Sequence, residues 1–280
     1  MTFAVHVAVP AGEAELAADA LWQAGAAAIE ERPGVLIAGT GLGGDPVALL
    51  AAVAGRWPAE VVAVDLALAL DAWRVHARAV PVGDRLVVRP PWVEPIPVGP
   101  PAGQRRAGDR LDVVIDPGRA FGHGGHPSTR LVLTALDSLV GGGERVLDIG
   151  CGSGVLAIAA LALGAGTAAG VDVDPAAVAA TRDNAVRNRV ADRLAVVAHV
   201  DDLDEARGVY DLVLANMLRP ELVAMAPVVA GALAPGGAVV VSGVLVGQRG
   251  DVLAAYRTVG LAPVAEHAED GWLAVILRAG

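Results

Sequence analysis

The 280-residue sequence has one cysteine, few aromatic residues and no cluster of basic residues, and each scarcity excludes a class of protein. Because Cys151 has no second cysteine to pair with, an intramolecular disulfide and a cysteine-based zinc knuckle are excluded, which fits a reducing cytoplasm. Aromatic residues make up 3% while 54% of residues are hydrophobic, so the core must be built mainly from alanine, valine and leucine. A formal net charge of -10 disfavours a general nucleic-acid binder, because neutralising phosphates takes clustered basic residues, and it leaves a basic protein as a compatible partner.

Neither an export signal nor a membrane span is expected. Residues 1–10 carry no lysine or arginine ahead of their apolar residues, which is not a signal-peptide pattern. The longest uncharged run, residues 222–248, is divided by Pro227, Pro235 and a glycine pair into a helix, a turn and a strand. We therefore expect a cytoplasmic protein without a membrane partner.

The N-terminal part is predicted to form a small α+β domain. Apolar periodicity predicts, in chain order, a strand at 3–9, a helix at 13–24, strands at 27–30 and 35–38, a helix at 45–54 and a strand at 60–66. This βαββαβ order predicts a ferredoxin-like domain over residues 1–70. No catalytic constellation lies in it, so we expect a packing or recognition role. Residues 71–112, rich in proline and tryptophan, are interpreted as a linker, with strands at 85–89 and 111–115.

From residue 113 to residue 280 the pattern changes to regular alternation of strands and helices. Helices are predicted at 128–139, 155–163, 175–188, 219–233 and 250–259, and strands at 145–149, 168–173, 194–197, 211–215, 238–242, 263–267 and 273–277. Alternation of this kind predicts a Rossmann-like α/β domain with a parallel, doubly wound sheet. In such sheets ligands bind at the carboxyl ends of the strands.

A glycine-rich loop is the strongest chemical signal. A buried strand leads into Asp148-Ile149-Gly150-Cys151-Gly152-Ser153-Gly154, and a helix follows. The glycines let the backbone pass close to a ligand and turn into the helix N-terminus. Asp172 ends the next strand about twenty residues on, at the position that binds ribose hydroxyls.

The spacing of the glycines favours one cofactor over another. A dinucleotide fingerprint needs Gly-x-Gly-x-x-Gly, but the sixth position counted from Gly150 is Val155, and Gly154 fills the fifth. Asp148 would repel a pyrophosphate, whereas its charge suits the ammonium of a methionine moiety, directly or through water. We therefore predict S-adenosylmethionine as the cofactor, with Asp148, Gly150, Gly152 and Gly154 in its binding site. The alternative is that Asp148 only caps the loop.

A second motif precedes this loop. Residues 116–129 read Asp-Pro-Gly-Arg-Ala-Phe-Gly-His-Gly-Gly-His-Pro-Ser-Thr. This run resembles the signature Asp-Pro-Gly-x-Ala-Phe-Gly-Thr-Gly-x-His-Pro-Thr-Thr of the family that methylates large-subunit ribosomal protein L11. Further runs resemble that family's motifs in order and spacing: Gly170 to Pro175, Asn184-Ala185-x-x-Asn188, Leu214 to Leu218 and Ser242 to Leu245. The resemblance is strong over residues 116–243 and loose before Trp73.

The resemblance implies a class I, S-adenosylmethionine-dependent protein methyltransferase whose small domain presents the ribosomal protein substrate. Carried over by position, it places cofactor contacts at Thr129, Gly150, Asp172 and Asn216. Two residues depart from the signature. His123 stands where the family has threonine and adds a titratable group, whereas Ser128 replaces a threonine by a similar hydroxyl.

Two residues are predicted to handle the acceptor amine. Asn216 ends a strand where related amino-methylating enzymes hold the acceptor nitrogen, and Phe121 lies in the signature loop. Their structural alternatives are that Asn216 caps the next helix and that Phe121 is ordinary core. His126 before Pro127 equally suits the start of a helix. After the third strand, His199, Asp201 and Asp202 suit either a solvated loop or an adenine contact.

No metal is expected, because His123 and His126 are the only closely spaced histidines and lack neighbouring acids. The leading prediction is a monomeric lysine methyltransferase acting on ribosomal protein L11. The alternatives are the same chemistry on another protein or a small amine, a nicotinamide-dependent oxidoreductase, and a non-catalytic binding module.

Overall fold

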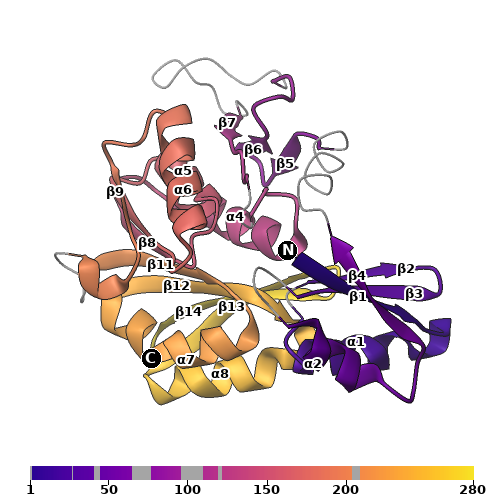
Figure 1. The fold of residues 1–280 in the computed structure, drawn as a ribbon. Coiled ribbons are helices and arrows are strands. Elements are labelled where there is room, and N and C mark those ends of the chain that lie inside the picture. Colours follow the sequence, from indigo (N-terminus) through magenta and orange to yellow (C-terminus); the bar gives the residue numbers. More distant parts are fainter. Residues whose placement is uncertain are drawn as a thin grey trace. The chain divides into compact units, whose positions relative to one another are not determined.

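The computed structural model of the chain describes residues 2–26, 28–40, 45–64, 77–95, 110–118, 122–203 and 209–280. The chain divides into two compact units, residues 1–76 and residues 77–280. Figure 1 shows the elements of both units. Among the described residues, none of the helices is both long enough and apolar enough to cross a membrane.

The first unit is a four-stranded antiparallel sheet covered by two helices. Its elements are β1 (Thr2–Ala8), a short 3-10 turn η1 (Ala11–Glu13), α1 (Ala14–Gln23), β2 (Ala28–Arg32), β3 (Val35–Gly39), α2 (Pro46–Val53) and β4 (Ala59–Val64). The strand order β2-β3-β1-β4 and the βαββαβ chain order are those of a ferredoxin-like domain, as predicted. Val5, Val7 and Leu21 are fully buried at the centre of its core. Asp45 begins α2 by accepting a hydrogen bond from the N–H of Val47, ahead of which Pro46 fits the first turn.

The second unit carries the predicted Rossmann-like sheet. Its elements are β5 (Val80–Val82), β6 (Leu86–Arg89), β7 (Leu111–Val114), α4 (Pro127–Leu139), β8 (Arg145–Ile149), α5 (Val155–Leu163), β9 (Thr167–Val171), α6 (Pro175–Arg187), β10 (Leu194–Val197), η2 (Val200–Asp202), β11 (Tyr210–Asn216), α7 (Arg219–Ala232), β12 (Leu233–Leu245), η3 (Val246–Gln248), α8 (Arg249–Thr258), β13 (Leu261–Glu269) and β14 (Trp272–Ala279). Seven of these strands form one sheet in the order β10-β9-β8-β11-β12-β14-β13. The order reverses between the adjacent parallel strands β8 and β11, so their carboxyl ends form the topological switch point.

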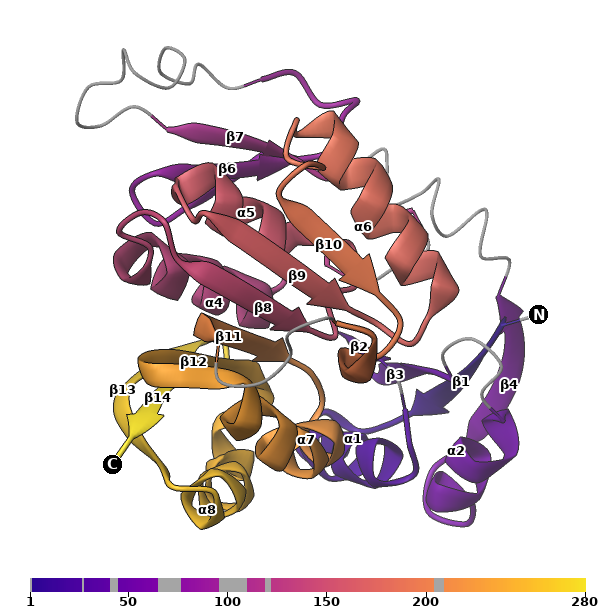
Figure 2. The same cartoon turned by 90° about the vertical axis from the view of Figure 1, so that its left-hand side faces the viewer.

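Alternate side chains of each central strand serve two separate cores. Val146 of β8 packs on the side of α4, α5 and α6, while Leu147 and Ile149 pack on the side of α7 and α8. Figures 1 and 2 show these helices on opposite faces of the sheet. Helix α5 is apolar throughout and buried, as expected of a helix covered on several sides. The doubly wound prediction is therefore confirmed.

The last two strands depart from the parallel pattern. β14 lies antiparallel to both β12 and β13. Asp270 and Gly271, both with positive φ (+49° and +80°), form the two-residue turn that joins β13 to β14. A link this short cannot make the long crossover that parallel neighbours need, so the strands must run in opposite directions.

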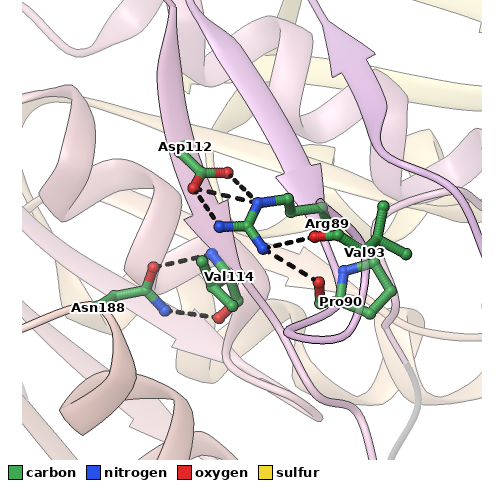
Figure 3. A network of polar contacts seen from close by, with 6 residues as sticks. All are labelled: Arg89, Pro90, Val93, Asp112, Val114 and Asn188. Carbon is green, nitrogen blue, oxygen red and sulfur yellow. Dashed lines mark hydrogen bonds and ion pairs between the residues drawn. The ribbon is translucent and has the colours of Figure 1, made fainter. Parts of the chain in front are cut away.

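Part of the segment interpreted as a linker forms strands of the second unit. β5 pairs antiparallel with β6, and β6 pairs parallel with β7. Arg89 of β6 joins this sheet to the turn that follows it: its guanidinium donates to both carboxylate oxygens of Asp112 and to the carbonyl of Val93, at 2.8 Å (Figure 3). Both side chains are largely buried, which makes the pair costly to break.

Removing one partner of this pair tests its structural role. Asp112→Ala should lower the free energy of unfolding by about 2 to 4 kcal/mol, because it leaves a buried guanidinium unpaired. Glu266→Ala, which removes an exposed partner of Arg249, should leave the urea midpoint unchanged. Equal midpoints for the two variants in urea unfolding would contradict this assignment.

Candidate active site

The glycine loop lies at the switch point, between β8 and α5. Gly150, Gly152 and Gly154 all have positive φ, at +75°, +55° and +80°. The N–H groups of Gly150 and Cys151 both donate to the carbonyl of Val171 in β9, at 2.8 and 3.0 Å. Gly154 ends the turn in a left-handed conformation directly before α5, and a Cβ there would lie 2.7 Å from a methyl of Thr181. Glycine is thus required both by backbone angle and by space.

Asp172 ties the end of β9 to this loop. One carboxylate oxygen accepts from the N–H of Gly152 at 2.9 Å, and the other accepts from the N–H of Asp174 at 3.0 Å. Each oxygen retains a second lone pair. The side chain is half-buried, so its outer face remains accessible to a hydroxyl group.

Asp148 is fully buried beneath the loop. Its Oδ2 accepts a long hydrogen bond, 3.3 Å, from the N–H of Ala157 in α5. Among the residues that the structure describes, its Oδ1 has no hydrogen-bond partner. Burial raises the pKa of this carboxyl from 3.8 to about 7; the hydrogen bond from Ala157 opposes this increase, and the charge of Asp172 adds a smaller one. An orphaned carboxylate oxygen at this place fits a cationic group, such as the ammonium of a methionine moiety.

Asn216 ends β11 on the other side of the switch point. Its Nδ2 donates to Oγ1 of Thr129, with a nitrogen-to-oxygen distance of 3.3 Å. It does not cap the following helix, because the residue that precedes α7 is Leu218 and no side chain caps that end. The structural alternative for Asn216 is therefore wrong.

Met217 connects the Asn216 strand end to the glycine loop. Its side chain lies against Gly150, where a Cβ would come within 2.9 Å of the thioether sulfur. The N–H of Met217 donates to the carbonyl of Ser242, at 3.2 Å. A Cβ on Gly243 would come within 2.3 Å of the Met217 carbonyl oxygen, so only glycine permits this crossing.

Thr129 lies, fully buried, in the first turn of α4. That helix begins at Pro127, and Nδ1 of His126 accepts from the N–H of Ser128 as its cap. The ring of His126 also meets Trp272 edge-on, at 4.6 Å between centroids. His126 therefore caps the start of the helix, which is the structural role that its position before Pro127 suggests.

The signature loop is described on both sides of Phe121, which itself lies outside the described residues. At one end, Oδ1 of Asp116 accepts from the N–H of Gly118. At the other, Nδ1 of His123 accepts from the N–H of Gly125 at 3.2 Å, and burial lowers the pKa of His123. The histidine that replaces the family's threonine is therefore held as a neutral ring.

After β10, the carboxylate of Asp202 accepts from the N–H of His199, and both side chains are exposed. Within the described ranges, no three His, Cys, Asp or Glu side chains are grouped as metal ligands. Apart from this turn, the structure brings the described site residues together in space. Gly152 contacts Asp172, Gly150 contacts Met217, and Asn216 contacts Thr129.

Comparison with known proteins decides the family. The profile of the family described as "Ribosomal protein L11 methyltransferase (PrmA)" matches residues 67–279. The chain belongs to this family.

A protein of the same name from Chromohalobacter salexigens is 40% identical over 241 residues, covering 82% of this chain and 77% of the relative. Another from Thiobacillus denitrificans is 45% identical over 70% of this chain, which spans 61% of that relative's length. A crystal structure of ribosomal protein L11 methylase from Lactobacillus delbrueckii subsp. bulgaricus superposes with a TM-score of 0.64 at 25% identity, covering 72% of this chain and 98% of that one.

Membership of the L11 methyltransferase family makes the chain an S-adenosylmethionine-dependent protein methyltransferase and removes the oxidoreductase alternative. Two buried residues that support the site were not among the predicted site residues. Thr181 donates to the carbonyl of Gly152 at 2.9 Å, and the hydroxyl of Ser242 contacts the carbonyls of Ser128 and Leu273. Thr181 could have been found from the sequence, because it is a threonine on the buried face of the helix that follows Asp172.

Because of Asp148, we expect the free energy of unfolding of the protein to fall as pH rises. Its pKa is raised on folding, so the folded protein binds a proton that the unfolded chain releases between about pH 4 and pH 7. The cofactor-free protein should lose up to about 4 kcal/mol of unfolding free energy across this window. Asp148→Asn should flatten that loss and, in urea unfolding at pH 8, be more stable than the parent.

Asp174→Asn is the matched control for Asp148→Asn. Asp174 caps α6 by accepting from the N–H of Ala176, a role that asparagine also fills. Its stability-against-pH curve should follow that of the parent. Parallel curves for the parent and Asp148→Asn from pH 5 to pH 8 would show that Asp148 is not the group responsible.

Proposed function

We propose that this chain transfers methyl groups from S-adenosylmethionine to amino groups of ribosomal protein L11. The observation that carries the proposal is the meeting of Asn216 and the glycine loop at one switch point, with Met217 packed between them. In an open α/β sheet this is where a cofactor and an acceptor bind together. The names of the relatives supply the substrate.

Seven residues are proposed to hold the cofactor. They are Thr129, Asp148, Gly150, Gly152, Gly154, Asp172 and Asn216. The free lone pairs of Asp172 suit ribose hydroxyls, and the orphaned oxygen of Asp148 suits the ammonium. The positive φ of the three glycines supports a close approach of ligand to backbone.

The acceptor amine is proposed to bind at Asn216, and Phe121 is proposed as a second residue that handles it. S-adenosylmethionine, when bound, supplies a methyl group on a cationic sulfur, and an amine lone pair attacks it in line as the carbon–sulfur bond breaks. Positioning of the amine therefore supplies most of the rate. Nδ2 of Asn216 donates to Thr129, and its Oδ1, for which the described residues supply no donor, can accept an N–H of the amine. Desolvation lowers the pKa of an entering lysine, and its proton leaves to water.

The small first unit is proposed to present the substrate. A chain of net charge -10 suits a basic ribosomal protein and a cytoplasmic monomer that makes no direct contact with nucleic acid. The family profile begins at residue 67, however, so it leaves the first unit unmatched. That observation keeps a second acceptor, another protein or a small amine, as the alternative.

Labelling identifies the acceptor. Incubation of the chain with methyl-labelled S-adenosylmethionine and ribosomal proteins of its own organism should label one band, L11. The chain contains no lysine, so any labelled lysine must come from the substrate. A single label on a different protein would favour the alternative acceptor, and the absence of any labelled ribosomal protein would refute the leading proposal.

Asn216→Ala tests the acceptor site. It should lower kcat about a hundredfold with both substrates saturating, because the amine loses the acceptor that orients it. Asp251→Ala, which removes the nearby exposed ion pair with Arg219, should retain full turnover. Full turnover by Asn216→Ala, with S-adenosylhomocysteine binding intact by calorimetry, would rule out this role.

A further inference from the structure

Asn184, on α6, binds the beginning of the signature loop as a strand neighbour would. Its Oδ1 accepts from the N–H of Asp116 and its Nδ2 donates to the carbonyl of the same residue, both at 2.9 Å. The same Nδ2 also donates to the carbonyl of Ser153, at 2.9 Å. The Asn184 side chain is fully buried, so none of these bonds competes with water.

Ser153 binds the other end of that segment. Its hydroxyl donates to the carbonyl of Gly122 at 2.5 Å. Gly122 has a φ of +101°, and a Cβ there would lie 2.9 Å from the Ser153 hydroxyl oxygen. Both ends of the segment from Asp116 to Gly122, which carries Phe121, are thus bonded to one residue of the cofactor loop, directly or through Asn184.

Asn188, one helical turn after Asn184, binds the backbone of Val114 in the same way that Asn184 binds Asp116. Its amide accepts from the N–H of Val114 at 2.9 Å and donates to the carbonyl of Val114 at 2.7 Å (Figure 3). Its remaining hydrogen bond goes to the carbonyl of Asn184, not to the cofactor loop. Of these two asparagines, Asn184 contacts Ser153 and Asn188 does not.

We infer that Asn184 and Ser153 are positioning residues that hold Asp116 and Gly122 of the signature loop to the cofactor loop, so that the acceptor and the cofactor are aligned together. This inference rests on the proposed function. Each loss leaves the N–H and C=O of one backbone residue without the asparagine amide. Asn184→Ala also leaves the carbonyl of Ser153 without this donor, at a fully buried site, whereas Asn188 is half-buried. Only the loss of Asn184 also removes a hydrogen bond to the cofactor loop.

The test compares Asn184→Ala with Asn188→Ala. Both should lower the unfolding midpoint, Asn184→Ala by more because its site is fully buried. With substrates saturating, Asn184→Ala should lower kcat about tenfold or more, and Asn188→Ala should stay within about threefold of the parent. Affinity for S-adenosylhomocysteine, measured by calorimetry, should weaken about tenfold in Asn184→Ala alone.

Ser153→Ala is the milder second variant, since it removes one hydrogen bond and little volume. Its loss in kcat should be less than additive with that of Asn184→Ala, because both act on one segment. Equal effects of Asn184→Ala and Asn188→Ala on kcat and affinity, or an unaffected Ser153→Ala, would overturn the inference. If the parent methylates no ribosomal protein, the proposed function fails, while the calorimetric comparison still decides whether the two loops are coupled.

Discussion

The hydrogen bonding of the glycine loop to β9 is the constraint on which the rest of the site depends. Three successive backbone N–H groups, those of Gly150, Cys151 and Gly152, are satisfied by the carbonyl of Val171 and the carboxylate of Asp172. Without these acceptors, a loop that joins a strand to a helix within five residues would bury backbone N–H groups that have no partner. This pairing forces positive φ at the glycines and fixes where α5 begins.

The acceptor side is built on the same loop by packing as well as hydrogen bonding. Met217 fills the space above Gly150, and its own backbone crosses Gly243, where no side chain fits. A change at either glycine would push this strand end away from the cofactor loop. The site thus consists of loops at the carboxyl ends of the strands that pack against one another. The sheet beneath them is rigid, with a core that is mostly alanine, valine and leucine.

The sequence predicted those features that local pattern and sheet topology determine together. The strand, glycine loop and helix follow from periodicity and spacing, and the positions of Asp172 and Asn216 follow from the rule that parallel strands end at one edge. Side-chain bonds between distant segments could not be found in this way. Asn184 meets Asp116 across 68 residues, and nothing in either local pattern specifies the partner. The antiparallel direction of β14 follows from the two-residue turn at Asp270 and Gly271, which the periodicity of the flanking strands does not indicate.

The charge on Asp148 links cofactor affinity to the stability of the empty protein. An asparagine at this position would keep an oxygen acceptor for the N–H of Ala157 without the desolvation penalty that raises the pKa of the carboxyl to about 7. A carboxylate is better than an amide here only when a cation joins it, since attraction between opposite charges grows as water is excluded. A cationic ligand beside the ionised carboxyl offsets the desolvation cost of that charge, and this attraction favours its binding. By the same linkage, a ligand that lacks the positive charge should gain least from Asp148, so the buried acid contributes to cofactor selectivity as well as affinity.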